Sequence, residues 1–174
     1  MTRPALFRWN DTFSVGIQEI DDQHKTLFDL INRLFQAALE RKDHAVSLEI
    51  LDALIDYTKI HFALEERLLE SAEYSDLPQH QLEHRKFEQE LSAMAQKFLA
   101  EEKTITFELI NFLKHWLKEH IMETDMAYAS QLSQSEFSTD AWSADARQVF
   151  SSRYQGHSQK PWWKFWADPS IQTS

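Results

Sequence analysis

The sequence predicts an all-α protein: an up-down-up-down four-helix bundle followed by a Trp-rich C-terminal extension. Glycine and proline are scarce, with two and four among 174 residues, which suits long helices better than folds with many tight turns. Apolar residues recur at helical spacing in four segments of roughly 20 residues joined by short connections. The hydrophobic share of 43% and the charged share of 26% are those of an ordinary globular domain.

The four helices are expected at about residues 21–40, 43 or 47 to 71, 79–100 and 104–130. Pro78 fits the first turn of the third helix, and Thr104 is the candidate cap of the fourth. We therefore expect a bundle domain over residues 1–130 and an extension over residues 131–174.

The extension holds four of the six tryptophans. Trp142, Ala146, Val149 and Phe150 share one face of a helix, so we expect a short helix there that packs on the bundle. The segment KPWWKFW, Lys160–Trp166, combines tryptophan with lysine, which suits docking on a membrane surface or on another protein. Two lysines contribute only about 1 kcal/mol each near an anionic surface, so both kinds of partner stay open.

Charge and composition argue against several classes of protein. The formal charge of −10 disfavours a nucleic-acid partner, because such binding depends on neutralising phosphates with lysine and arginine. The absence of cysteine excludes disulfides, zinc–thiolate sites and thiol chemistry. No apolar run approaches the length of a membrane span, and the N-terminal MTRPALFRWNDTF lacks the apolar core of a signal peptide. A cytoplasmic protein is expected.

Two predicted helices carry pairs of metal-ligand residue types one turn apart. Residues four apart on an α-helix lie about 40° apart on one face. His61 and Glu65 on the second helix can therefore reach a common point, as can His80 and His84 on the third. These pairs stand close to the apolar stripes, where a core would normally place leucine or isoleucine.

The other two helices supply less regular candidates. Asp125 follows His120 by five residues, about 140° around an α-helix, and His24 lies shortly before the apolar Leu27. A lone histidine is more often a hydrogen-bonded core residue, and a His–Glu pair four apart is more often a surface ion pair. Five imidazoles and two carboxylates in one core, however, would leave many polar groups to satisfy, and a metal cluster satisfies them together.

The ligand types narrow the choice of metal. No glutamate is followed three positions later by histidine, which disfavours the ferritin-like di-iron bundles. No HExxH motif is present, which disfavours a zinc protease. Imidazole suits iron, zinc, copper and nickel, and carboxylates add affinity for harder ions, so the ligands permit iron without requiring it.

The residues from about Trp9 to Tyr128 resemble the hemerythrin family, in particular its single-domain bacterial members, the bacteriohemerythrins. The resemblance is carried by FSVGI and QHKTL near the N-terminus, HFALEE from His61, HQLEH from His80 and HWLKEHIMETD from His115. All seven positions of the family's metal pattern are filled at compatible spacings.

This resemblance implies a non-haem centre of two iron ions that binds dioxygen reversibly, for oxygen storage, transport or delivery and without enzymatic turnover. By analogy, the seven residues divide into His80, His84 and His120 on one iron, His24 and His61 on the other, and Glu65 and Asp125 as bridges. An oxo or hydroxo group from solvent completes the bridge. The second iron then keeps one position for dioxygen, and the wall of the oxygen pocket is expected to be formed by Phe62, Trp116, Leu117 and Ile121.

Two other functions stay open. One is an oxygen or redox sensor module, and the other is a di-iron enzyme acting on peroxide or nitric oxide. Proton donors near the centre would favour the enzyme, and Tyr128, close after Asp125, is a candidate donor.

Several polar residues near these motifs are assigned other roles. His44 and His157 are expected in solvent, and His115 has no counterpart in the family's metal pattern. Asp21 and Asp22 are expected either to cap the first helix or to hydrogen-bond to a ligand histidine, with capping favoured for Asp22.

Overall fold

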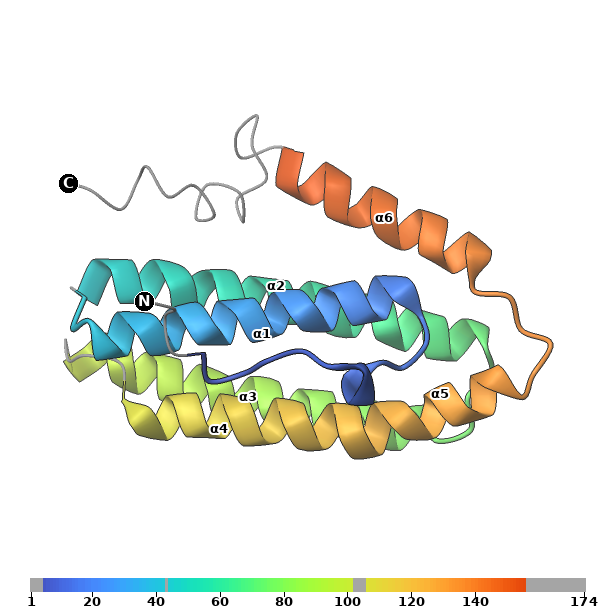
Figure 1. Cartoon of the computed structure of the whole chain (residues 1–174), viewed down its shortest axis with the longest axis horizontal. Helices are drawn as coiled ribbons and strands as arrows, with labels where there is room; N and C mark the ends of the chain where they lie inside the picture. Colours follow the sequence, from blue (N-terminus) through green and yellow to red (C-terminus); the bar gives the residue numbers. More distant parts are fainter. Residues whose placement is uncertain (1–4, 43, 102–105, 156–174) are drawn as a thin grey trace. The chain divides into compact units, whose positions relative to one another are not determined.

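The structure is a computed structural model of the chain and describes residues 5–42, 44–101 and 106–155. Every regular element among these residues is helical, which confirms the all-α class. The bundle consists of α1 (Gln18–Leu39), α2 (His44–Ser71), α3 (Leu77–Glu101) and α4 (Phe107–Glu119). These helices lie lengthwise side by side, and consecutive helices run in opposite directions (Figure 1). The up-down-up-down bundle is therefore confirmed.

The fourth helix of the bundle is not a single α-helix. α4 continues through the π-helical segment η2 (His120–Asp125) into α5 (Met126–Ser133). Its first turn is capped by Thr106, whose Oγ1 accepts a hydrogen bond from Leu109 N at 3.3 Å. A threonine suits this position because its hydroxyl satisfies one of the backbone N–H groups that a helix start leaves free. The cap predicted at Thr104 lies outside the described residues.

The start of α1 differs from the sequence-based expectation. The helix begins without a side-chain cap, so the prediction that Asp21 or Asp22 caps it is wrong. Because α1 starts earlier than expected, Asp21 lies inside its first turn, where its carboxylate accepts hydrogen bonds from Val15 N at 2.8 Å and from the Ser14 hydroxyl. Asp22 is exposed and pairs with Lys25 at 2.9 Å.

The apolar stripes of the helices meet in one core. Its fully buried members include Ile20, Leu34, Leu54, Leu68 and Leu113. Burying each such side chain stabilises the fold by about 1.5–3 kcal/mol. The core therefore holds the helices together along their length, and the polar candidates described below are enclosed within it.

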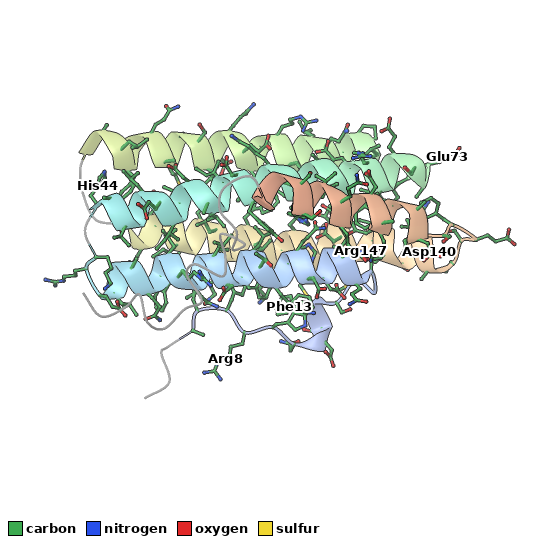
Figure 2. The ribbon with its side chains drawn as sticks, turned by 90° about the horizontal axis from the view of Figure 1, so that it is seen from above. Arg8, Phe13, His44, Glu73, Asp140 and Arg147 are labelled. Carbon is green, nitrogen blue, oxygen red and sulfur yellow. The ribbon has the colours of Figure 1, made fainter. Side chains whose placement is uncertain are left out.

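The segment before α1 is fastened to that helix. Figure 2 shows Phe13 on this segment, and its ring packs edge-on against Phe28 of α1 with centroids 5.0 Å apart. Asn32 of α1 accepts hydrogen bonds from Leu6 N at 2.8 Å and Phe7 N at 2.9 Å, and it donates to Phe7 O at 2.9 Å. One amide side chain thus satisfies three backbone groups of the segment.

The described residues from 138 onward form a second unit. Its described helix is α6 (Asp140–Gln155), which covers the stretch where a short helix was expected. The packing of this stretch on the bundle stays a prediction. His157 and the docking segment Lys160–Trp166 lie outside the described residues. Among the described helices, none combines the length and the hydropathy needed to cross a bilayer.

Replacing Asn32 by alanine should lower the free energy of unfolding by about 1–3 kcal/mol, because partly buried backbone groups lose their partners. The measurement is urea denaturation of the metal-free protein. Asp22→Asn, which removes an exposed ion pair on the same helix, is the control and should change that free energy by less than about 0.5 kcal/mol. Equal effects of the two substitutions would show that Asn32 does not hold the segment.

Candidate metal centre

All seven residues proposed as metal ligands are buried in the bundle. They come from four elements: His24 from α1, His61 and Glu65 from α2, His80 and His84 from α3, and His120 and Asp125 from η2. None is more than 4% exposed. Ionisable side chains are seldom fully buried without partners, so these residues require either one another or a bound ion.

The larger of two groups contains Glu65, His80, His84 and His120, whose ligand atoms lie within 4.8 Å of one another. The Nε2 atoms of His80 and His84 each lie 3.3 Å from Glu65 Oε2. The Nε2 atoms of His84 and His120 lie 3.0 Å apart. Three imidazole nitrogens from two elements therefore converge beside one carboxylate.

The smaller group contains His24, His61 and Glu65, again within 4.8 Å. Asp125 stands between the groups, because its Oδ1 lies 3.1 Å from His120 Nε2 and its Oδ2 lies 3.4 Å from His24 Nε2. Glu65 belongs to both groups. The two carboxylates thus lie between a set of three imidazoles and a set of two.

The π-helical segment η2 explains how His120 and Asp125 reach one point. On an α-helix they would stand about 140° apart, and the assumption of an unbroken α-helix is wrong here. In a π-helix the backbone hydrogen bonds join residues five apart, so residues at this spacing come close to the same side of the helix. Such π-helical turns are rare and occur frequently at functional sites. A local change of helix type therefore creates this pair.

Most of these side chains have polar atoms that the protein leaves without a hydrogen bond. Among the described residues, nine buried side-chain polar atoms have no hydrogen-bond partner, and seven of them belong to His24, His61, His80, His120 and Asp125. Each such atom costs about 1–3 kcal/mol. Imidazole nitrogens and carboxylate oxygens are suitable ligands for non-haem iron. The residue set therefore fits a bound metal cluster, which would satisfy these atoms together.

Each histidine among the candidate ligands has one ring nitrogen that faces the other candidate ligands and a second, outer nitrogen. Sequence reasoning missed the residues that contact these outer nitrogens. His61 Nδ1 lies 2.8 Å from Gln23 Oε1, and His84 Nδ1 lies 2.9 Å from Glu66 Oε1. Gln23 directly precedes a candidate ligand in the sequence and Glu66 directly follows one. That adjacency is a weak signal, because neighbouring residues point to different faces of a helix. The contacts arise only from the packing of different helices.

Burial and neighbouring charges shift the pKa values of the candidate ligands in different directions. Burial lowers the pKa of His61 to about 3, although nearby Glu65 acts in the opposite direction. Burial also acts to lower the pKa of His120, but the nearby carboxylates of Asp125 and Glu83 overcome it and raise that pKa to about 10. Burial and Glu65 act to raise the pKa of Asp125, yet the charge of His120 and the proximity of His120 and His24 hold it at about 2. Without metal, protons therefore reside on His120 rather than on Asp125.

Three of the four predicted pocket-wall residues line one small cavity. Phe62, Trp116 and Leu117 border a space of about 10 Å³ together with other, mainly apolar side chains. The rings of Phe62 and Trp116 stack on the candidate ligands His84 and His120, with centroids 3.7 and 4.3 Å apart. The fourth predicted residue, Ile121, is fully buried but does not border this cavity.

The remaining histidines lie outside the two groups. His44 is half-buried and its ring packs on Phe98 with centroids 4.4 Å apart, so the expectation that solvent surrounds it is wrong. Helix α3 supplies the apolar ring that covers it. His115 is exposed and its Nδ1 donates to Asn111 O at 2.7 Å.

Loading the metal-free protein with ferrous iron at about pH 8 should release protons, because His120 with its pKa of about 10 must lose a proton before its Nε2 can bind metal. Release can be followed with a pH indicator in weakly buffered, oxygen-free solution. His115→Gln, at an exposed position, should leave the release unchanged. Iron uptake without any proton release would contradict the raised pKa of His120.

Comparison with known proteins agrees with this geometry. The family model described as "Hemerythrin HHE cation binding domain" matches residues 15–132. A bacteriohemerythrin of Stenotrophomonas maltophilia is 38% identical over 128 residues, 74% of this chain and 82% of the relative. One of Methylococcus capsulatus is 35% identical over 130 residues, 74% of this chain and 98% of the relative.

Solved structures give the same result. A crystal structure of wild-type hemerythrin superimposes with a TM-score of 0.68 at 34% identity, covering 72% of this chain and 97% of that one. The region that the family model matches, residues 15–132, contains α1–α4 and all seven candidate ligands. The chain therefore belongs to the hemerythrin family of non-haem iron proteins.

Proposed function

We propose that the chain binds dioxygen reversibly at a centre of two iron ions and serves in oxygen storage, transport or delivery. The observation that carries the proposal is the division of the buried ligand atoms into two unequal groups that share Glu65. One group has three imidazoles and the other has two. Such a division leaves the second ion with fewer protein ligands and room for a small exogenous molecule.

In this assignment the histidines divide by group and the carboxylates are shared. The ligands are His80, His84 and His120 for one ion, His24 and His61 for the other, and Glu65 and Asp125 for both. The positions of Asp125 Oδ1 and Oδ2, near His120 and His24 respectively, support its shared role. When bound, the irons supply the electrons that dioxygen accepts on binding and returns on leaving.

The side chains beside the centre support binding without further reaction. The cavity of about 10 Å³ bordered by Phe62, Trp116 and Leu117 has room for about one molecule of the size of water. Its lining is apolar apart from Thr58, whose hydroxyl already donates to Leu54 O at 2.8 Å. The surroundings therefore offer few groups that could deliver protons to a bound molecule.

Tyr128 is the nearest candidate for such a proton donor, and its environment makes it a poor acid. The side chain is fully buried, and its hydroxyl donates to Glu65 Oε1 at 2.7 Å. Burial and the neighbouring charges of Glu65 and Asp125 raise the pKa of this phenol well above 10. We therefore assign Tyr128 to fixing the carboxylate of Glu65 and favour reversible binding over an enzymatic role.

The full chain, loaded anaerobically with ferrous iron, should hold two irons. Oxygen should then produce a visible absorption band that disappears when the oxygen is removed. His61→Ala, which removes a ligand from the smaller group, should reduce the iron content to about one and abolish the band, whereas His115→Ala should change neither. Iron analysis and spectral titration test this. One iron per chain in the unaltered protein would overturn the proposal.

Placing a polar group in the pocket wall should shorten the lifetime of the oxygenated protein. Leu117→Asn introduces an amide into the apolar cavity, which favours entry of water and protons. Irreversible loss of the oxygen-dependent band should become several-fold faster. Leu117→Met, with a similar apolar volume, is the matched control and should keep the original rate. Equal rates for both variants would show that Leu117 does not line the oxygen pocket.

A further inference from the structure

The histidines of the two groups differ in what their outer nitrogens contact. A histidine that binds metal through one ring nitrogen usually donates its other N–H to a neighbouring group, and that group tunes the ligand. Here two of the three histidines in the larger group have a charged outer partner, whereas His80 Nδ1 has no hydrogen-bond partner among the described residues, and the one outer partner in the smaller group is neutral. The difference follows from residues that the family assignment does not use.

Glu66 is the closest charged partner. Its Oε1 lies 2.9 Å from His84 Nδ1, so the imidazole donates to a carboxylate. The Glu66 side chain is only 13% exposed, and its carboxylate also accepts hydrogen bonds from Arg85 Nη1 at 3.2 Å and from Gln81 Nε2 at 3.1 Å. His84, Arg85 and Gln81 thus all donate to this carboxylate, which orients it toward His84.

Glu83 adds a second negative charge on the same side. Its Oε2 lies 3.5 Å from His120 Nδ1, an ion-pair distance. The Thr124 hydroxyl donates to the same oxygen at 2.8 Å, and Gln79 Nε2 donates to the other oxygen at 3.4 Å. Two of the three histidines in the larger group therefore have a carboxylate behind them.

Among the described residues, no carboxylate is hydrogen-bonded to an outer nitrogen of the smaller group. His61 Nδ1 contacts Gln23 Oε1 at 2.8 Å, and this amide is 4% exposed. His24 Nδ1 has no hydrogen-bond partner among the residues that the structure describes. An amide oxygen is a weaker acceptor than a carboxylate, because charge-assisted hydrogen bonds are roughly twice as strong.

We infer that Glu66, with support from Glu83, makes the two iron positions unequal: the three-histidine position binds its ion more tightly and holds it more firmly in the oxidised state. This inference rests on the proposed di-iron function. A carboxylate that accepts from the outer N–H strengthens the imidazole as a ligand, and its negative charge favours the more highly charged ion. Glu66 acts through His84 and is a positioning residue.

The inequality has a consequence for the site. The ion of the larger group binds first and is released last. It therefore organises the shared carboxylates before the second ion enters. The second position, with its neutral outer partners, keeps the weaker hold on its ion. Outer groups of this kind typically change metal affinity by about 10–100-fold.

The test uses the full-length, metal-free chain titrated anaerobically with ferrous ion against a coloured chelator, together with the midpoint potential of the loaded protein. Glu66→Gln keeps the size and an acceptor oxygen but removes the charge. It should weaken the tighter of the two binding steps by about 10–100-fold, change the weaker step by less than about twofold, and raise the potential.

Glu70→Gln removes the same charge from an exposed site one turn further along α2 and should alter neither affinity nor potential. Thermal unfolding of the metal-free variants shows whether each is folded. If Glu66→Gln behaves like Glu70→Gln, or weakens both steps equally, the inference is overturned while the di-iron function stands. If the unaltered chain binds fewer than two irons, both fail together.

Discussion

The structure depends on one constraint: the seven candidate ligands, all ionisable side chains, are buried inside an apolar helical bundle. Removing a charged group from water is unfavourable unless an opposite charge or a metal compensates. His61 and His120 show the two extremes: burial is the main cause that lowers the pKa of His61 to about 3, and adjacent carboxylates raise the pKa of His120 to about 10. Burial of these groups is compensated only while they stay close to one another. The relative positions of the helices and the integrity of the site are therefore coupled.

That coupling gives the helix irregularity a physical reason. An unbroken α-helix through residues 120–125 would turn Asp125 away from His120 and leave a buried charge without a counterpart. The π-helical segment η2 gives up regular hydrogen bonding over one turn and brings Asp125 Oδ1 within 3.1 Å of the imidazole. The backbone adapts locally because the cost of an isolated buried carboxylate exceeds the cost of one irregular turn.

The sequence predicted the bundle from periodicity, whereas the full set of seven candidate ligands was implied by the resemblance to the hemerythrin family. Apolar spacing located the helices, and His61 with Glu65 or His80 with His84 stood out as pairs one turn apart. Features that depend on contacts between helices could not be predicted in this way. Gln23 reaches His61 across 38 positions and Glu66 reaches His84 across 18, and neither residue type is unusual on a helix. The role of Asp21 was missed for a related reason, since the start of α1 placed it differently from the expected cap.

The candidate ligands also form a boundary between two environments. Their ring faces are covered by aromatic side chains, as Phe62 covers His84 and Trp116 covers His120. The outer nitrogen edge of the same His84 ring meets the charged Glu66. One imidazole can thus be tuned by a carboxylate at its edge while an aromatic ring covers its face, because the two contacts use different parts of the ring.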